Sequence, residues 1–169
     1  PAARALLAQG FRRGAPVDIG ILRFQLRSSG LRYDDVSTLY CDAENGYVIV
    51  GYAAHGIDIY DAGSDEWRHV DRNSGLAAND VHSIAVVGDR QQIWVASDDG
   101  VTVSAGSDSA FYDSSNSPLV AGSVGALAAA ADGTVWVGGD GALYRVEDEE
   151  WTTYGADEVQ GDFPDGLIV

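Results

Sequence analysis

The amino-acid sequence repeats itself three times, and this internal repeat restricts the possible folds more than any other feature. Equivalent leucines open the three copies at intervals of 45 and 43 residues, and the apolar centre of each copy recurs at intervals of 45 and 42: Leu31, Leu76 and Leu119; Ile49, Trp94 and Trp136. Each copy consists of short apolar runs separated by turns rich in glycine and aspartate. Such a period is typical of β-propeller blades, whereas helical repeats would place apolar residues at i, i+3, i+4 and i+7. We therefore expect an all-β chain.

Four strands are predicted in each copy. In the second copy they cover residues 81–87, 92–96, 100–104 and about 110–112, running from the channel outward, with polar turns between them. Asp132-Gly133 is a favoured tight-turn pair, and the glycine that opens each third strand indicates a positive φ or a close backbone approach. These glycines are Gly56, Gly100 and Gly141.

The predicted fold is about three to three and a half four-stranded blades, forming part of a larger ring, with a short N-terminal arm or helix. Residues 18–169 form the partial propeller, with repeats at about 30–74, 75–117 and 118–160 and a next blade beginning near 166. Residues 20–24 are a candidate fragment of another blade. Residues 1–17 form a basic arm or a short helix that ends near Gly10 or Gly14.

The repeat resembles a known family. Gly75-Leu76-Ala77-Ala78-Asn79-Asp80-Val81, followed by Ile93-Trp94-Val95-Ala96-Ser97-Asp98-Asp99-Gly100-Val101, is similar to the two-component regulator propeller repeat. Residues 132–141 match its second half, whereas the first copy departs from it with Ile49 in place of the tryptophan and a longer loop at 51–56. The resemblance covers residues 30–154. It implies a seven-bladed propeller in the exported sensor region of a bacterial signalling protein, in the periplasm or outside the cell. Streptogramin-lyase-like propellers have similar repeats.

Three blades do not close a ring, because propellers contain roughly 4–8 of them. An open arc would expose apolar blade faces larger than a monomer normally tolerates. We expect the remaining blades to come from a second chain or from a homo-oligomer that closes the ring by symmetry. The absence of an initiator methionine and the abrupt C-terminal end suggest a piece of a longer protein, although a complete subunit is the alternative.

The charge of the chain is strongly negative and unevenly distributed. Its formal net charge is -16, yet residues 1–32 hold six arginines and one aspartate. The acidic body makes nucleic acid a poor partner, and no apolar run is long enough for a membrane span. The basic leader either docks onto an acidic surface or stays solvated.

Polar residues gather in loops that the propeller geometry places at one mouth of the channel, where ring folds tend to bind ligands. This acidic rim is a candidate site for a cation, a basic partner or a hydroxyl-rich ligand, and Ca²⁺ is the cation considered. The alternative is that these aspartates and asparagines form turns by bonding their own backbone. The candidate residues are Asp34, Asp35, Tyr52, His55, Asn79, Asp80, Asp98, Asp99 and Asp140.

No catalytic residue and no cofactor are predicted. The three histidines, His55, His69 and His82, lack metal-ligand spacing, and a zinc site is not expected. Cys41 lies in an apolar run and is expected to be a buried thiol. Trp94 and Trp136 occupy matching positions and are predicted to lie in the core between blades.

The function that we predict is therefore a non-catalytic ligand- or protein-binding propeller segment of an exported bacterial protein, sensory or scaffold in role. Two alternatives remain. One is part of a lyase-like propeller enzyme whose active site lies in missing blades, and the other is an assembly subunit joined through open blade edges.

Overall fold

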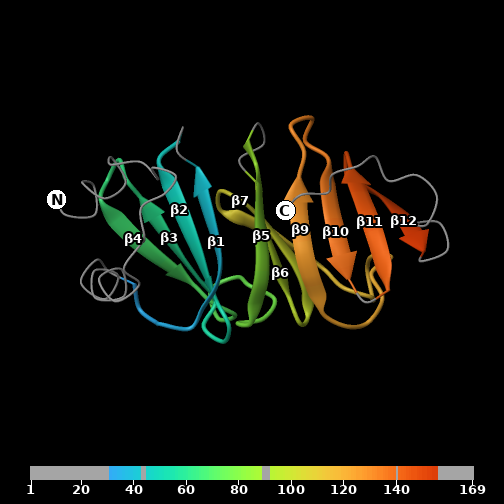
Figure 1. Ribbon diagram of the computed structural model, residues 1–169, viewed down its shortest axis with the longest axis horizontal. Coiled ribbons are helices and arrows are strands. Elements are labelled where there is room, and N and C mark those ends of the chain that lie inside the picture. Colours follow the sequence, from blue (N-terminus) through green and yellow to red (C-terminus); the bar gives the residue numbers. More distant parts are fainter. Residues whose placement is uncertain (1–30, 43–44, 89–91, 140, 156–169) are drawn as a thin grey trace, which may run out of the picture.

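The computed structural model describes residues 31–42, 45–88, 92–139 and 141–155, and these form three four-stranded antiparallel sheets (Figure 1). Blade 1 contains β1 (Val36–Asp42), β2 (Tyr47–Tyr52), β3 (Ile57–Asp61) and β4 (Glu66–Val70). Blade 2 contains β5 (Val81–Val87), β6 (Gln92–Ser97), β7 (Gly100–Ala105) and β8 (Asp108–Tyr112). Blade 3 contains β9 (Val124–Ala129), β10 (Val135–Gly139), β11 (Ala142–Glu147) and β12 (Glu150–Gly155).

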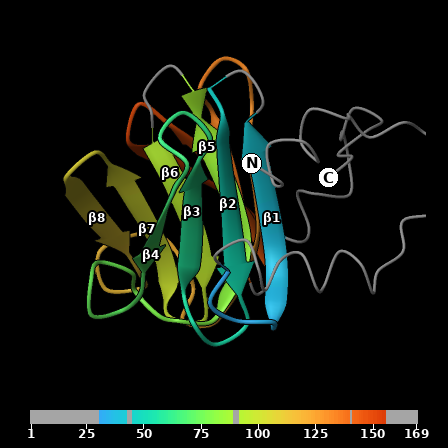
Figure 2. The same cartoon turned by 90° about the vertical axis from the view of Figure 1, so that its left-hand side faces the viewer.

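Each sheet is a meander in which consecutive strands are neighbours, as β1-β2-β3-β4 in blade 1. The three sheets stand side by side, with β1, β5 and β9 next to one another and the fourth strands outermost in their sheets (Figures 1 and 2). This arrangement confirms the predicted all-β fold of partial propeller blades. The four strands of blade 2 agree with the predicted ranges to within one or two residues.

Two apolar layers hold the blades together. The layer between blades 1 and 2 contains Ile49 and Ile59 from one sheet and Val81, Ile84 and Val95 from the other. Along β3 every second residue points into the layer, whereas on β5 the bulge places Val81 and Ile84 three residues apart on the same face. Buried apolar area of this kind is the main favourable contribution to the stability of the fold.

The layer between blades 2 and 3 is larger. It joins Trp94, Ala96 and Val101 of blade 2 to Val135 and Val137 of blade 3, all of them buried. Blade 2 therefore has both faces covered, which explains the continuous apolar run of β6.

A β-bulge interrupts the innermost pairing at the same place in every blade. The register shifts between Val36 and Thr38, between Val81 and Ser83, and opposite Gly138 and Gly139. The extra residues are Ser37, His82 and Gly125, the second residue of each innermost strand. A bulge changes the direction of the side chain that it carries. In blade 2 that side chain is an imidazole.

Two expectations about single residues need correction. Cys41 is exposed rather than buried, because it alternates with Tyr40, whose ring packs towards blade 2, and so it lies on the opposite face of β1. Trp94 is buried between blades as predicted, but Trp136 is only half-buried. Its neighbours Val135 and Val137 point towards blade 2, so that Trp136 points away from it.

The predicted N-terminal arm, the blade fragment at 20–24 and the next blade from about 166 lie outside the described residues. In the described part of the chain, no helix is both long and apolar enough to cross a membrane.

Candidate functional site

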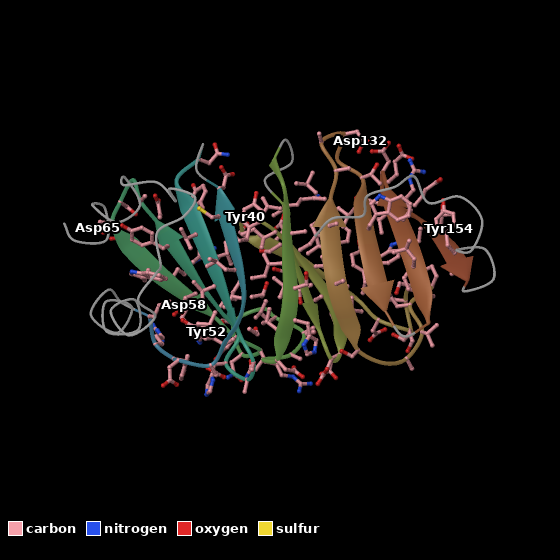
Figure 3. All side chains as sticks on the ribbon, viewed as in Figure 1. Tyr40, Tyr52, Asp58, Asp65, Asp132 and Tyr154 are labelled. Carbon is pink, nitrogen blue, oxygen red and sulfur yellow. The ribbon has the colours of Figure 1, made fainter. Side chains whose placement is uncertain are left out.

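One end of the three blades collects nearly all of the predicted site residues. Antiparallel pairing places the start of each innermost strand beside the end of the second strand, as Val81 beside Ser97 in blade 2. We call this end the rim; it comprises the segments that lead into β1, β5 and β9 together with the β2–β3 and β6–β7 turns. Tyr52 and Asp58 lie towards the rim in Figure 3, whereas Asp65 and Asp132 lie towards the opposite end.

Most of the predicted residues reach this surface. Tyr52 does not, because it is fully buried beneath it, and Asp140 lies outside the described residues. The predicted residues found at the rim are Asp34, Asp35, His55, Asn79, Asp80, Asp98 and Asp99.

In blade 1 the rim carries an ion pair with an aromatic cover. His55 Nδ1 lies 2.9 Å from Asp35 Oδ2, and the ring of Tyr33 stacks on the imidazole with centroids 3.8 Å apart. The second carboxylate oxygen of Asp35, Oδ1, is buried and has no hydrogen-bond partner within the described residues. Tyr33 remains 37% exposed.

A buried polar network lies beneath that pair. Asp58, which is 1% exposed, accepts a hydrogen bond of 2.5 Å from the Tyr52 hydroxyl and lies 2.8 Å from His69 Nδ1. The backbone amide of Arg32 also donates to Asp58 Oδ2, at 3.2 Å. Burial, followed by the bond to Asp58, raises the pKa of Tyr52. Because a buried carboxylate is costly unless its oxygens are bonded, this network fixes the segment before β1.

Asn79 and Asp99 have structural partners. The Asn79 side chain accepts from the Arg72 amide at 2.7 Å, and its backbone oxygen accepts from Gly56 N at 2.7 Å. It therefore ties the connection between blades 1 and 2 to the β2–β3 turn. Asp99 Oδ2 lies 3.7 Å from Arg72 Nη2 on the surface, where such pairs contribute little free energy.

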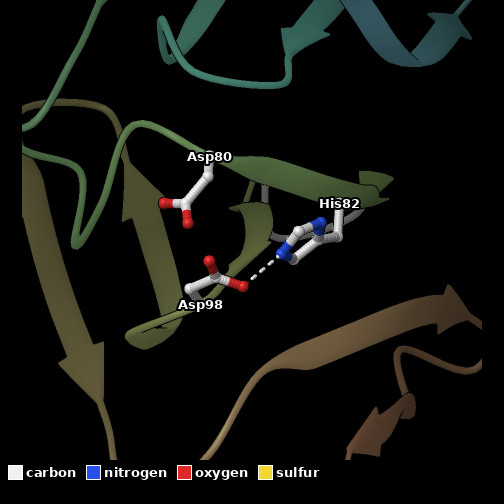
Figure 4. Close-up of side chains that lie close together, drawn as sticks. All are labelled: Asp80, His82 and Asp98. Atoms are coloured by element: carbon white, nitrogen blue, oxygen red, sulfur yellow. Dashed lines mark hydrogen bonds and ion pairs between the residues drawn. The ribbon is translucent and has the colours of Figure 1, made fainter.

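Blade 2 brings three ionisable side chains together at the rim (Figure 4). His82 Nε2 lies 2.7 Å from Asp98 Oδ1, and the carboxylate of Asp80 faces that of Asp98. Burial, together with a hydrogen bond to Asp98, raises the pKa of Asp80. Hydrogen bonds to Asp80, His82 and Ser123 lower the pKa of Asp98 to about 2. Of the two facing carboxylates, Asp80 therefore has the higher pKa.

A shallow pocket adjoins this cluster between blades 2 and 3. Its wall includes Asp98, Asp99 and Asp113 and the loop from Leu119 to Val124. Three carboxylates on so small a surface favour ligands that donate hydrogen bonds or carry positive charge.

Sequence reasoning missed four members of the site: Tyr33, Asp58, His69 and His82. An alignment of the copies places Asp35, Asp80 and Ser123 at the same position, immediately before the innermost strand, and His82 two residues later in blade 2. That alignment was the available signal. Ligand spacing along the sequence gave no reason to pair His82 with Asp98, whereas in the fold the bulge turns His82 towards it.

Comparisons with known proteins show where this fold occurs. No protein-family model matches the sequence, and no curated protein is similar to it. Among solved structures, the extracellular domain of a protein described as a hybrid two component system, BT3049 from B. thetaiotaomicron, has a TM-score of 0.60 at 17% identity. That match covers 77% of this chain and 20% of that chain.

A second such domain, from BT4673 of the same organism, gives a TM-score of 0.58 at 17% identity and covers 69% of this chain and 17% of that one. The chain therefore spans a fifth or less of these relatives. At this level of identity the likeness concerns the fold. It matches the resemblance to two-component regulator propellers that the repeat carries, and the chain has the fold of part of such a propeller.

Proposed function

We propose that this chain is part of the sensory propeller of an extracellular or periplasmic bacterial receptor, and that its rim binds ligand without catalysis of its own. The two solved structures named above are extracellular domains of two-component systems, which supports that placement. The observation that carries the proposal is the composition of the rim: ionisable side chains from two blades, an exposed tyrosine ring and an acidic pocket lie at one end of a rigid scaffold.

The ligand class follows from the chemistry of the rim. Asp35 Oδ1 is buried and has no hydrogen-bond partner among the described residues, and a ligand hydroxyl or amine that reached it would supply one. Tyr33, 37% exposed, offers an aromatic ring that the apolar side of a sugar or an amine could contact. We infer a hydroxyl-rich or basic ligand rather than an anion, since carboxylates repel negative charge.

Ligand mapping tests this proposal. The full chain, labelled with ¹⁵N, would be titrated in the presence of EDTA with neutral oligosaccharides and with polyamines, and chemical-shift changes followed residue by residue. We expect changes at Tyr33, Asp35 and His55, and loss of binding in Asp35→Asn. The control Asp132→Asn, at the opposite end, should bind as the parent does. Chemical-shift changes centred on Asp65 and Asp132 would contradict the proposal. So would the absence of any change with both oligosaccharides and polyamines.

A second proposal concerns partners. The face of blade 3 that points away from blade 2 carries Trp136, with the ring of Tyr154 packed 5.7 Å from it. On blade 1 the corresponding outer face carries Leu39, 61% exposed. We propose that these two faces join further propeller blades, from a second chain or a second copy, because no sheet among the described residues covers them.

A further inference from the structure

Three side chains of metal-binding type converge where β5 begins. A carboxylate oxygen of Asp80, a ring nitrogen of His82 and a carboxylate oxygen of Asp98 all lie within 4.8 Å of one another. We propose that these three residues bind one divalent transition-metal ion of the zinc class. The proposal needs only these side chains and does not rest on a sensory role of the rim.

The spacing suits such an ion after a small adjustment. Ligand atoms held at about 2.0–2.2 Å from a tetrahedral ion are roughly 3.3–3.6 Å apart. His82 Nε2 and Asp98 Oδ1, now 2.7 Å apart through a hydrogen bond, would separate by less than about 1 Å as the ion replaces the bridging proton. Rotation of exposed side chains can supply this movement, since Asp98 is 58% exposed and His82 is 35% exposed.

The backbone places the histidine for this role. All three blades have a bulge at the second residue of the innermost strand, so the bulge itself belongs to the architecture. The residue that occupies it differs: Ser37 in blade 1, His82 in blade 2 and Gly125 in blade 3. Only blade 2, among the described residues, combines an imidazole at the bulge with a carboxylate just before the strand, Asp80, and a second one in the β6–β7 turn, Asp98.

A cation would also balance the charge of two carboxylates that lie close together. The carboxylates of Asp80 and Asp98 face each other, and His82 is the one basic side chain that contacts them among the described residues.

The donor set selects the class of ion. An imidazole nitrogen with two carboxylates suits Zn²⁺ or Mn²⁺, whereas Ca²⁺ requires six to eight oxygen ligands. Three protein ligands and an open side leave at least one position for water or for an oxygen of another molecule.

Calorimetry with Zn²⁺ on the full chain at pH 7.5, where an ordinary imidazole is neutral, tests the proposal. We expect one ion per chain, with affinity at least about 10-fold weaker in both His82→Ala and Asp98→Asn. The matched control is His55→Ala: His55 also pairs with an aspartate, Asp35, but belongs to no three-ligand group among the described residues. It should bind Zn²⁺ as tightly as the parent.

Imidazole ¹H–¹⁵N spectra provide a second readout, because the chain has three histidines. On addition of Zn²⁺, the ring nitrogens of His82 should shift first and those of His69 should not. The proposal is overturned if Zn²⁺ binds equally well to the parent, His82→Ala and Asp98→Asn, if Ca²⁺ binds as tightly as Zn²⁺, or if no stoichiometric binding is seen. Because the ligand titrations for the sensory role contain EDTA, either proposal can fail while the other stands.

Discussion

Asp58 is the residue on which the inner part of blade 1 depends. It lies on β3 between Ile57 and Ile59, which point into the core with blade 2, and so it points to the opposite face. There its two oxygens are bonded to Tyr52, His69 and the Arg32 amide. A charged group buried to this degree persists only when its partners are complete.

Removing one partner should therefore destabilise the chain measurably. Tyr52→Phe keeps the ring but removes the hydroxyl that donates to Asp58, and we expect a loss of about 1–3 kcal/mol in the free energy of unfolding. Urea unfolding followed by tryptophan fluorescence measures it. The control Tyr60→Phe removes a hydroxyl that bonds to the exposed Asp65, and its cost should be smaller. Equal losses in the free energy of unfolding for the two variants would mean that the buried network adds no more stability than the Tyr60 hydrogen bond does.

For single residues, the sequence predicts where a side chain lies better than it predicts which side chain it bonds to. Asp35, Asp80 and Asp98 were placed at one end of the blades because strand alternation alone determines which loops share an end. The pairing of Tyr52 with Asp58 was not predictable, since it depends on which face of β3 is covered. The role of His82 was hidden for a similar reason: a bulge changes the register by one residue, and no residue type marks it in all three copies.

At the scale of strands, the glycine that opens β7 is tightly constrained by the neighbouring backbone. Gly100 has a φ of 126°, and a Cβ built on it would run into the carbonyl oxygen of Tyr112. Gly100→Ala should lower the free energy of unfolding by at least about 1–3 kcal/mol, from backbone strain alone. Gly125→Ala is the control, because a Cβ there meets nothing within 4 Å. Urea midpoints of both variants measure the two effects. A Gly100→Ala variant with the urea midpoint of the parent would show that the backbone at this turn can relax.

The connection after β8 should make the free energy of unfolding depend on pH. Hydrogen bonds from the Ser115 hydroxyl and amide lower the pKa of Asp113. A carboxyl whose folded-state pKa lies below its unfolded value adds stability that is complete above about pH 4 and is lost as the pH falls through the folded value. Asp113→Asn should thus have a lower urea midpoint than the parent at pH 7, and the difference should shrink at pH 3.

The control for this variant is Asp108→Asn, which removes a carboxylate that accepts one hydrogen bond, from Ser107. It should change the urea midpoint less at both pH values. A difference between Asp113→Asn and the parent that grows on acidification would contradict the assigned sign.

Strand positions were the most predictable feature of the chain, because each blade repeats the same sequence of apolar run, turn and glycine. The innermost strand of blade 2 was predicted with its observed bounds, Val81–Val87. The outer strands were less well defined, since β8 is largely exposed and carries little apolar pattern. Where neighbouring blades do not cover a strand, its sequence is free to vary.

At the scale of the whole molecule, we expect the apolar layer between blades 2 and 3 to contribute most to the stability of the fold. Trp94, 6% exposed, lies within it, and Trp94→Ala should cost about 3–5 kcal/mol through loss of apolar contact and an unfilled cavity. Trp67, half-buried on β4 against Tyr60, provides the comparison, and its replacement by alanine should cost less. Differential scanning calorimetry measures the loss of stability in each variant. A larger loss in Trp67→Ala than in Trp94→Ala would show that the main core lies at the outer strands.

Trp136 occupies the position of Trp94 one repeat later, but its environment differs. The equivalent side chain in blade 2 is covered by blade 3, whereas no described sheet covers Trp136. If further blades cover this face, the isolated chain should associate with itself or aggregate, because a half-buried indole and Tyr154 would otherwise face water.

Trp136→Glu places a charge on that face and should shift the chain towards monomer in sedimentation-velocity experiments. Phe111→Glu, at an exposed aromatic on β8, should leave the association unchanged. A parent chain that is monodisperse, monomeric and cooperatively folded would show instead that these three blades need no others.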